Sequence, residues 1–278
     1  MLRNRAFRTY LKSRISDAKI LDAIEEAERV SSGDATLSNI APYVTSKFNR
    51  FLQDAQLRRI VGHGAMAIDF RQAMDSGKIL VFRLAQGRVG RAAASILLAQ
   101  IVARFRLAAM SRADTPRSSR KPYFLYIDEC QVLADSNVAD MLSQCRKYAL
   151  GLVLANQYVG QLRERGVLGA VLGNVGTLAT FRVSADDAQL LESVFFPTIS
   201  AQDIVECPNW NGYMRLYSSR NPIPPFSFST LPPDTTVPDL QWAQELREKS
   251  RQRWGVPQEK IDERIAARRS WIRNLTNP

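Results

Sequence analysis

The sequence predicts an α/β fold, a mostly parallel β-sheet with helices on both faces. From Lys78 onward, short apolar runs alternate with longer helical stretches, which is typical of strands joined by crossover helices. The runs are continuous, as expected for strands that are buried on both faces. Two of them end in polar pairs, Asp128-Glu129 and Asn156-Gln157. Because ligands bind beyond the carboxyl ends of parallel strands, these pairs mark a candidate site.

Length and composition suit one large domain with appendages. The chain has 278 residues, of which 45% are hydrophobic, enough for a full core. We expect a helical segment over 1–56, the main domain over 57–235 and a charged helical tail over 236–278. Apolar residues of the first segment recur on one helical face. They are Ile40, Val44, Phe48 and Leu52.

The main domain is expected to open with a strand, a turn and a helix. Ile79–Phe82 is a short apolar run, 87–90 supplies a glycine turn, and a helix follows over about 91–110. The polar stretch 111–121 predicts a surface loop that leads into a second strand, Tyr123–Ile127.

Helices and strands then alternate. We predict a helix over about 138–149, a strand over 152–155, a helix over about 159–172 and a strand over 176–183. Another helix follows Asp186.

The end of the chain reads as a strand, an extended run and a helix. The strand is predicted over 213–217, and prolines keep 222–238 extended. A charged helix covers 239–275 and breaks near 255–257, and its tryptophans are expected to pack on the domain.

The charge favours polyanionic partners. Thirty-eight Lys and Arg residues against 27 Asp and Glu residues give a net charge of +11. Nucleic acid is the first candidate and an anionic membrane surface the second, while a protein that is merely basic explains the charge equally well. No apolar stretch is expected to reach the length of a membrane span, and the N-terminus has no signal-peptide pattern. We therefore expect a cytoplasmic location.

The cysteines and the histidine argue against a metal centre or a histidine-based triad. Cys130, Cys145 and Cys207 lack metal-ligand spacing, and His63 is the single histidine of the chain. We predict that the thiols are free and buried.

The sharpest chemical pattern is the apolar strand that ends in Asp128 and Glu129. In nucleoside triphosphatases, the first such carboxylate holds Mg²⁺, often through water, and the second polarises the attacking water. A strand end that is simply solvated gives the same pattern.

Two further residues extend this hypothesis. Gln157 ends the next strand, where an amide can contact both the γ-phosphate and the attacking water; helix capping or a surface amide is its alternative. Arg146 lies on the helix predicted over 138–149 and is either a surface arginine or a finger that reaches a neighbouring subunit's phosphate.

A phosphate-binding P-loop, G-x-x-x-x-G-K-[ST], occurs nowhere in the sequence. Gly77-Lys78 precedes a strand instead of following one. The segment 87–90 lies between a strand and a helix but lacks the full dinucleotide pattern G-x-G-x-x-G, so we interpret it as a turn that needs glycine.

The ordered series FLYIDECQVLA, SQCRKYALGLVLANQY and LGNVGTLATFRVSADDAQLL resembles the HerA/FtsK class of ring-forming DNA-pumping ATPases, and most of all the TraG/TraD type coupling proteins of conjugation and type IV secretion. The upstream stretches LRNRAFRTYLKSRISD, VTSKFNRFLQDAQLRRIVG and MDSGKILVFRLAQGRVGRAAASILLAQIV also resemble this family. The likeness extends to about residue 235 and implies a RecA-like core.

The resemblance implies a role for each candidate residue. Asp128 would be the Walker B carboxylate that holds Mg²⁺, Glu129 the catalytic carboxylate and Gln157 the γ-phosphate sensor. Arg146 would be the arginine finger, with Arg182 a weaker candidate. ATP and Mg²⁺ would be the cofactors, DNA the partner, and a hexameric ring the assembly, beside secretion or conjugation proteins.

The family's P-loop precedes an all-α insertion, and residues 1–56 resemble the end of that insertion. The expectation is therefore a C-terminal portion of such a motor, inactive alone. The alternative is a non-catalytic DNA-binding or docking subunit of a secretion or conjugation complex. A Rossmann-type oxidoreductase is the third choice, because the dinucleotide pattern is missing.

Overall fold

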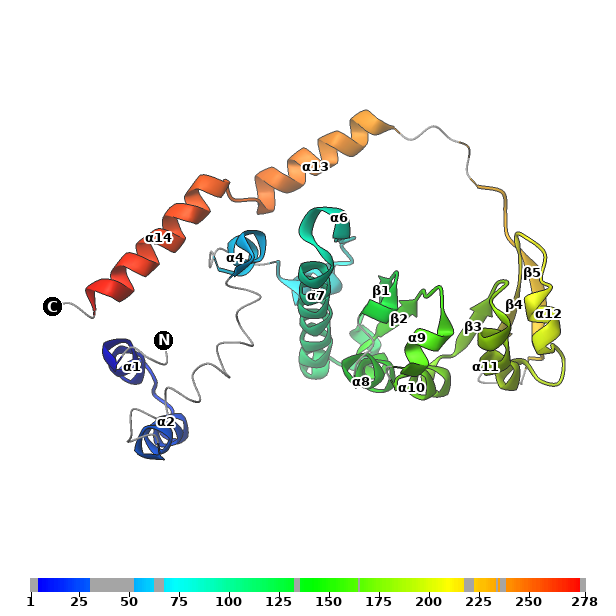
Figure 1. Cartoon of the computed structure of the whole chain (residues 1–278), viewed down its shortest axis with the longest axis horizontal. Coiled ribbons are helices and arrows are strands. Elements are labelled where there is room, and N and C mark those ends of the chain that lie inside the picture. Colours follow the sequence, from blue (N-terminus) through cyan, green and yellow to red (C-terminus); the bar gives the residue numbers. More distant parts are fainter. Residues whose placement is uncertain are drawn as a thin grey trace. The chain divides into compact units, whose positions relative to one another are not determined.

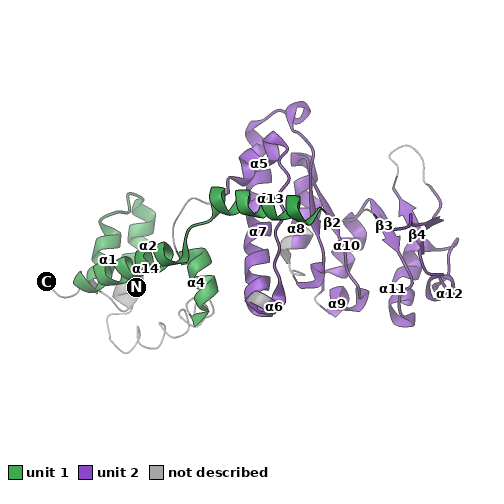
Figure 2. Cartoon of the chain, turned by 90° about the horizontal axis from the view of Figure 1, so that it is seen from above, with its two compact units in different colours: residues 1–67, 239–278 green, residues 68–238 purple. Residues whose placement is uncertain are grey.

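The structure, a computed structural model, falls into two compact units. Unit 1 comprises residues 1–67 and 239–278, and unit 2 comprises 68–238 (Figure 2). The structure describes 5–30, 53–62, 68–132, 136–164, 166–217, 223–233, 235 and 239–275. The helical pattern predicted from Ile40 to Leu52 and the position of His63 lie outside these described residues.

Unit 1 is helical where it is described. Its helices are α1 (Arg5–Lys12), α2 (Ala18–Val30), α4 (Ala55–Gly62), α13 (Leu240–Trp254) and α14 (Gln258–Asn274). The predicted break of the charged tail is confirmed, because it separates α13 from α14.

The tail packs on the N-terminal helices within unit 1. The Trp271 ring of α14 meets the rings of Phe7 and Tyr10 edge-on, at centroid distances of 6.2 and 4.9 Å. Arg59 of α4 donates two hydrogen bonds of 2.9 Å to the carboxylate of Asp262. These hydrogen bonds lower the pKa of Asp262 below its usual range.

Unit 2 begins with helices. They are α5 (Phe70–Ser76), α6 (Gln86–Val89) and α7 (Arg91–Ser111), followed by the 3₁₀ turns η1 (Arg112–Asp114) and η2 (Arg117–Ser119). The long helix predicted over 91–110 is confirmed as α7. Gly90, just before it, has φ +78°, a conformation that favours glycine, as the predicted turn requires.

Helix α7 is long and mostly apolar. Among the described residues, Arg91–Asp114 is long and apolar enough to cross a membrane by length and composition. The expectation concerned an uninterrupted apolar run, and Gln100, Arg104 and Arg106 interrupt this helix. Val102, Phe105 and Ala109 of α7 are buried in the core, and core helices meet the same criterion, so the finding indicates a span only weakly.

The first sheet is a parallel pair, as predicted. Strand β1 (Tyr123–Ile127) pairs in register with β2 (Leu150–Leu154), from Tyr123 opposite Leu150 to Ile127 opposite Leu154. Between them lie η3 (Cys130–Val132), α8 (Ser136–Gln144) and the 3₁₀ turn η4 (Cys145–Tyr148). Helix α8 ends sooner than the helix predicted over 138–149, because the chain tightens into η4 and Ala149 is left-handed, with φ +59°.

The strand predicted over 79–82 does not form. The segment keeps a strand's alternation, since Leu80 and Phe82 pack against the core while Ile79 and Val81 are 91% and 87% exposed. It makes no ladder hydrogen bonds with β1. The segment therefore has the side-chain alternation of a strand but is not paired with a neighbouring strand.

Helices cover one face of β1 and β2, not both as predicted. Leu150 and Ile127 point into a core built with α7 and α8. On the other face, Phe124 and Tyr126 remain 58% and 73% exposed, and the Phe124 ring lies over Gly151, where a Cβ would come within 2.7 Å of it. The two aromatic side chains form a contiguous exposed apolar patch, whereas apolar residues on the surface of a soluble domain are usually scattered singly.

The bare face is expected to bind the dye ANS. Replacing Phe124 and Tyr126 by lysine should lower the fluorescence of bound ANS at least about twofold, because it removes the two exposed aromatic side chains from this face. The matched control changes Leu231 and Leu240, exposed elsewhere, to lysine. An equal loss in both variants would contradict a localised patch.

The remaining strands form a separate antiparallel sheet, which corrects the mostly parallel prediction. Its order is β3 (Thr177–Thr180), β4 (Asn211–Leu216) and β5 (Phe226–Ser229), antiparallel throughout (Figure 1). Strand β5 lies in the proline-rich run, so Phe226–Ser229 of that run is extended as predicted. At β4, a Cβ on Gly212 would lie 2.6 Å from the Thr180 carbonyl oxygen, so the close pairing needs glycine there.

Two helices lead from β2 to β3, and two more lead from β3 to β4. They are α9 (Val159–Glu164), α10 (Leu168–Asn174), α11 (Ala185–Phe195) and α12 (Ala201–Val205). The single helix predicted over 159–172 is two, because Gly166 turns the chain with φ +72°. The helix predicted after Asp186 is confirmed as α11.

All three cysteines are free and buried, as predicted. Burial raises the pKa of the Cys130 thiol to about 11 and also raises the pKa of Cys145. At pH 8 the native protein should therefore react with DTNB far more slowly than free cysteine, since little thiolate forms. The same protein in guanidinium should expose all three thiols at once, and a native rate equal to that of free cysteine would contradict their burial.

Candidate functional site

The carboxyl ends of β1 and β2 lie side by side. The last matched pair is Ile127 and Leu154, and the pairing continues beyond both strands. The Ala155 N–H donates to the Ile127 carbonyl at 2.9 Å, and the Cys130 N–H donates to the Ala155 carbonyl at 3.0 Å. The segments that follow the two strands are therefore held together by backbone hydrogen bonds.

Glu129 is the centre of the polar contacts at this edge. Its two carboxylate oxygens accept hydrogen bonds from the side-chain amides of Gln157 and Gln131. Glu129 is half-buried and has φ +53°, a left-handed conformation that costs free energy in a residue with a Cβ. Such strain concentrates at functional sites.

Asp128 is exposed beside it, and its Oδ1 accepts a hydrogen bond of 2.9 Å from the Glu129 N–H. In the described part of the chain, no group of three or more His, Cys, Asp or Glu side chains could hold a metal. Mg²⁺ usually takes one or two carboxylates and completes its shell with water and phosphate oxygens. Asp128 fits Mg²⁺ bound in that way and does not fit a metal enclosed by protein ligands.

The segment Gly77-Lys78 does not form a phosphate cradle. Gly77 is the left-handed C-cap of α5, with φ +70°, and the Lys78 N–H donates to the Ala73 carbonyl at 2.9 Å. Gly77-Lys78 therefore ends a helix. The residues present can hold Mg²⁺ but do not supply the grip on the phosphates.

Arg146 lies at the other edge of the sheet. It is exposed on η4, which leads into the amino-terminal end of β2, whereas Glu129 and Gln157 follow the carboxyl-terminal ends. The structure thus brings Glu129, Gln157 and Asp128 together and leaves Arg146 one strand length away. Arg146 is also on a 3₁₀ turn, not on the helix predicted for it.

Arg182 belongs to neither group. It is exposed after β3, and its Nη2 donates to Asn209 Oδ1 at 2.8 Å. This contact joins two loops beside the antiparallel sheet.

Two residues of the site region were missed by the sequence reasoning. Gln131 contacts Glu129 and had only its position two residues after that carboxylate as a signal. Buried Asp187 of α11 accepts hydrogen bonds from the Val159 and Gly160 N–H groups at 3.0 and 2.8 Å. It thereby caps α9 and fixes the chain that follows Gln157.

A cavity of about 890 Å³ reaches this edge of the sheet. Segment 77–86, α7 and β1 line it, mostly with apolar side chains, and Asp128 and Glu129 lie at its border. The acidic pair is thus reached both from solvent and from this cavity.

Comparison with known proteins gives the fold. No protein family and no curated protein sequence matches the chain. A solved structure, plasmid coupling protein TrwB in complex with ADP and Mg²⁺, is 18% identical, with a TM-score of 0.56 over 81% of this chain and 57% of that chain. The chain shares the fold of a plasmid coupling protein.

The likeness covers part of the TrwB chain, and a second solved structure also matches. The chain spans 57% of the length of the TrwB chain. The genome packaging NTPase B204 from Sulfolobus turreted icosahedral virus 2, in complex with ATP-gammaS, also matches at 13% identity, with a TM-score of 0.41 over 61% of this chain and 74% of that chain.

Proposed function

We propose that this chain is the Walker B half of a DNA-translocating ATPase of the conjugative coupling protein type, with a RecA-like core. The observation that carries the proposal is the contact between Glu129 and Gln157 at the carboxyl ends of two parallel strands. An acid and an amide so placed can orient one water molecule between them. The fold shared with TrwB, whose structure holds ADP and Mg²⁺, supports the same reading.

Each residue at this edge has a distinct task. Glu129 orients the attacking water and accepts a proton from it. Its hydrogen bond with Gln157 makes the position of that amide depend on the protonation of the carboxylate. Gln131 holds the second carboxylate oxygen and limits rotation of the side chain. Asp128 would hold Mg²⁺ through water, and the ion would neutralise charge on the ATP phosphates.

Arg146 fits a role across a subunit interface. It is exposed at the edge opposite Glu129, so it cannot serve its own chain's site without a large movement. In a ring, an exposed arginine of one subunit can face the phosphates held by its neighbour. We therefore propose Arg146 as the finger in a hexameric form, with Arg182 the weaker candidate.

The remaining parts of the proposal concern partners and place. DNA is the proposed cargo, which suits the net charge of +11. Secretion or conjugation proteins are the proposed neighbours, at the cytoplasmic face of a membrane. The grip on the phosphates must come from a P-loop outside this sequence, so the chain alone is expected to be inactive.

The test is complementation. The purified chain is mixed with a P-loop-bearing N-terminal fragment of a homologous coupling protein, and ATP hydrolysis is measured with and without DNA. DNA-stimulated hydrolysis by the mixture, absent from either part alone, is the expected result. Hydrolysis by the fragment alone at the same rate would sink the proposal that this chain supplies the catalytic carboxylate.

The second candidate function is a non-catalytic DNA-binding or docking subunit. The missing P-loop and the positive charge favour it. It predicts salt-sensitive, sequence-independent DNA binding that ATP does not change. A change in DNA affinity on adding ATP and Mg²⁺ to the complemented mixture would exclude it.

A further inference from the structure

Basic side chains gather at the amino-terminal edge of β1 and β2. Residues 115–121 lead into β1, and η4 leads into β2. Because the strands are parallel, both segments lie at the edge opposite Asp128 and Glu129. The Lys78 carbonyl, which accepts a hydrogen bond of 2.9 Å from the Tyr123 hydroxyl, lies at the same edge. We call this surface the basic edge; its members are Lys78, Arg117, Arg120, Lys121 and Lys147, and Arg146 is left out because it is the proposed finger.

Arg120 joins the two segments. Its Nη1 donates to the Lys147 carbonyl at 2.6 Å, and its Nε donates to the Thr115 carbonyl at 2.9 Å. Its guanidinium lies 5.3 Å from the centre of the Tyr148 ring, and the Lys147 ammonium lies 5.0 Å from the same ring. Two cations are thus held on one aromatic side chain, close to each other in spite of their like charge.

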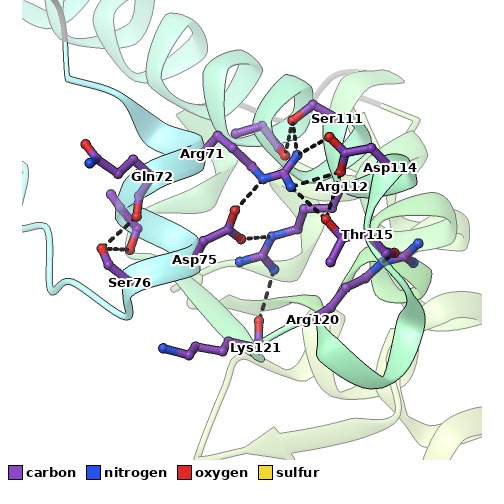
Figure 3. A network of polar contacts seen from close by, with 12 residues as sticks. Arg71, Gln72, Asp75, Ser76, Ser111, Arg112, Asp114, Thr115, Arg120 and Lys121 are labelled. Carbon is purple, nitrogen blue, oxygen red and sulfur yellow. Dashed lines mark hydrogen bonds and ion pairs between the residues drawn. The ribbon is translucent and has the colours of Figure 1, made fainter.

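Arg112 holds the same two segments from the buried side. It is fully buried, and its Nη1 donates to the Lys121 carbonyl at 3.0 Å and to the Tyr148 carbonyl at 3.1 Å. Figure 3 shows Arg112 between Asp75 and Lys121, whose side chain points away from the network. The backbone that presents the cations is therefore ordered before any ligand arrives, which lowers the entropy cost of binding.

The positive charge of the basic edge is not balanced locally. Segment 115–121 has three basic residues, η4 has two, and neither has an acidic residue. The acids near them, Asp75 and Asp114, are already paired with Arg71 and Arg112. Five like charges on one small surface repel each other, and a polyanion relieves that repulsion.

We propose that the basic edge binds the phosphate backbone of nucleic acid. Arginine and lysine side chains neutralise phosphates, and the exposed hydroxyls of Ser118 and Ser119 can donate to phosphate oxygens. The exposed residues of the two segments include no large apolar side chain that could enter a membrane interface, which disfavours a lipid surface. The proposal rests on the proposed function only for the choice of DNA as the nucleic acid.

The test is DNA binding by the full chain without ATP. Fluorescein-labelled 20-nucleotide single strands and 20-base-pair duplexes are titrated at several salt concentrations, with anisotropy as the readout. The variant Arg117→Glu with Lys121→Glu changes two exposed basic residues. It should bind at least about tenfold more weakly at 100 mM salt, and its salt slope should fall by about 2, one for each lost phosphate contact.

The matched control is Arg247→Glu with Lys249→Glu on α13, which changes the net charge by the same amount on another exposed basic helix. It should change affinity less than threefold, by about the effect of net charge alone. Arg117→Gln with Lys121→Gln should fall between wild type and the double reversal. Circular dichroism and urea midpoints equal to wild type exclude misfolding.

Three outcomes would overturn the proposal. One is equal weakening in the control, which would place binding on overall charge or on the tail. Another is unchanged DNA affinity in the double reversal. The third is binding to phosphatidylserine vesicles that the double reversal abolishes while DNA binding persists. None of these outcomes depends on ATP hydrolysis. The complementation test can therefore fail while the basic edge is shown to bind DNA, and the basic edge can fail while complementation succeeds.

Discussion

Changing Glu129 to glutamine is expected to lower DNA-stimulated ATP hydrolysis by the complemented mixture at least about 100-fold. The substitution keeps the shape of the side chain and its position between Gln131 and Gln157 but removes the group that accepts the proton. The new amide keeps both contacts only if Gln131 or Gln157 turns its own amide oxygen toward the added N–H. The measurement is the rate of phosphate release with saturating DNA.

The control for this prediction is Glu164→Gln, which removes an exposed carboxylate of α9 and should leave the rate within about twofold of wild type. DNA affinity is measured for both variants, since neither lies on the basic edge and both should keep it. Hydrolysis that survives Glu129→Gln with normal DNA binding would reject Glu129 as the catalytic carboxylate without touching the shared fold.

The parallel pair could be predicted because apolar runs that alternate with helices and end in polar pairs are typical of neighbouring parallel strands. Tyr123–Ile127 and the run up to Leu154 became neighbouring parallel strands, with their polar ends together. The run Ile79–Phe82 has the same character but no ladder, because a strand also needs a partner edge, and composition does not say whether one is present. A single sequence window cannot separate these two cases.

The antiparallel pairing of β3, β4 and β5 could not be predicted from the sequence patterns for another reason. Whether β3 pairs with a strand that runs with it or against it depends on how α11 and α12 return the chain, not on the residues of the strand. Strand β5 is also hidden among prolines, which normally argue against a strand and are tolerated here at its flanks, on the sheet's edge.

The candidate site divides in the same way. Glu129 and Gln157 were predicted to meet because each ends a strand, and strand ends converge by topology. Asp187 was not found, since its role comes from a contact with Val159 and Gly160 across 28 and 27 residues. Contacts that depend on the packing of one helix against another leave no local signal.

Replacing Asp75 by asparagine is expected to destabilise unit 2 by about 3 kcal/mol, because it leaves the charge of Arg112 buried without a counter-ion. Arg112 is fully buried, and its Nε donates to Asp75 Oδ1 at 2.9 Å. Its Nη2 is also buried and has no hydrogen-bond partner among the described residues. No second acceptor is therefore in place to compensate for the loss of the Asp75 carboxylate. The free energy of unfolding is measured in urea.

The matched control lies in the same network. Asp114 also pairs with Arg71, at 2.9 Å, but its side chain is 69% exposed and it does not reach Arg112 (Figure 3). Asp114→Asn should therefore cost less than about 1 kcal/mol, the usual range of an exposed ion pair. The Arg71 hydrogen bond lowers the pKa of Asp114, so its small contribution is present at neutral pH and is lost as the pH falls through that pKa. Equal destabilisation by the two substitutions would show that the exposed pair, not the buried guanidinium, stabilises this edge, and the ordered backbone on which the basic edge depends would need another source.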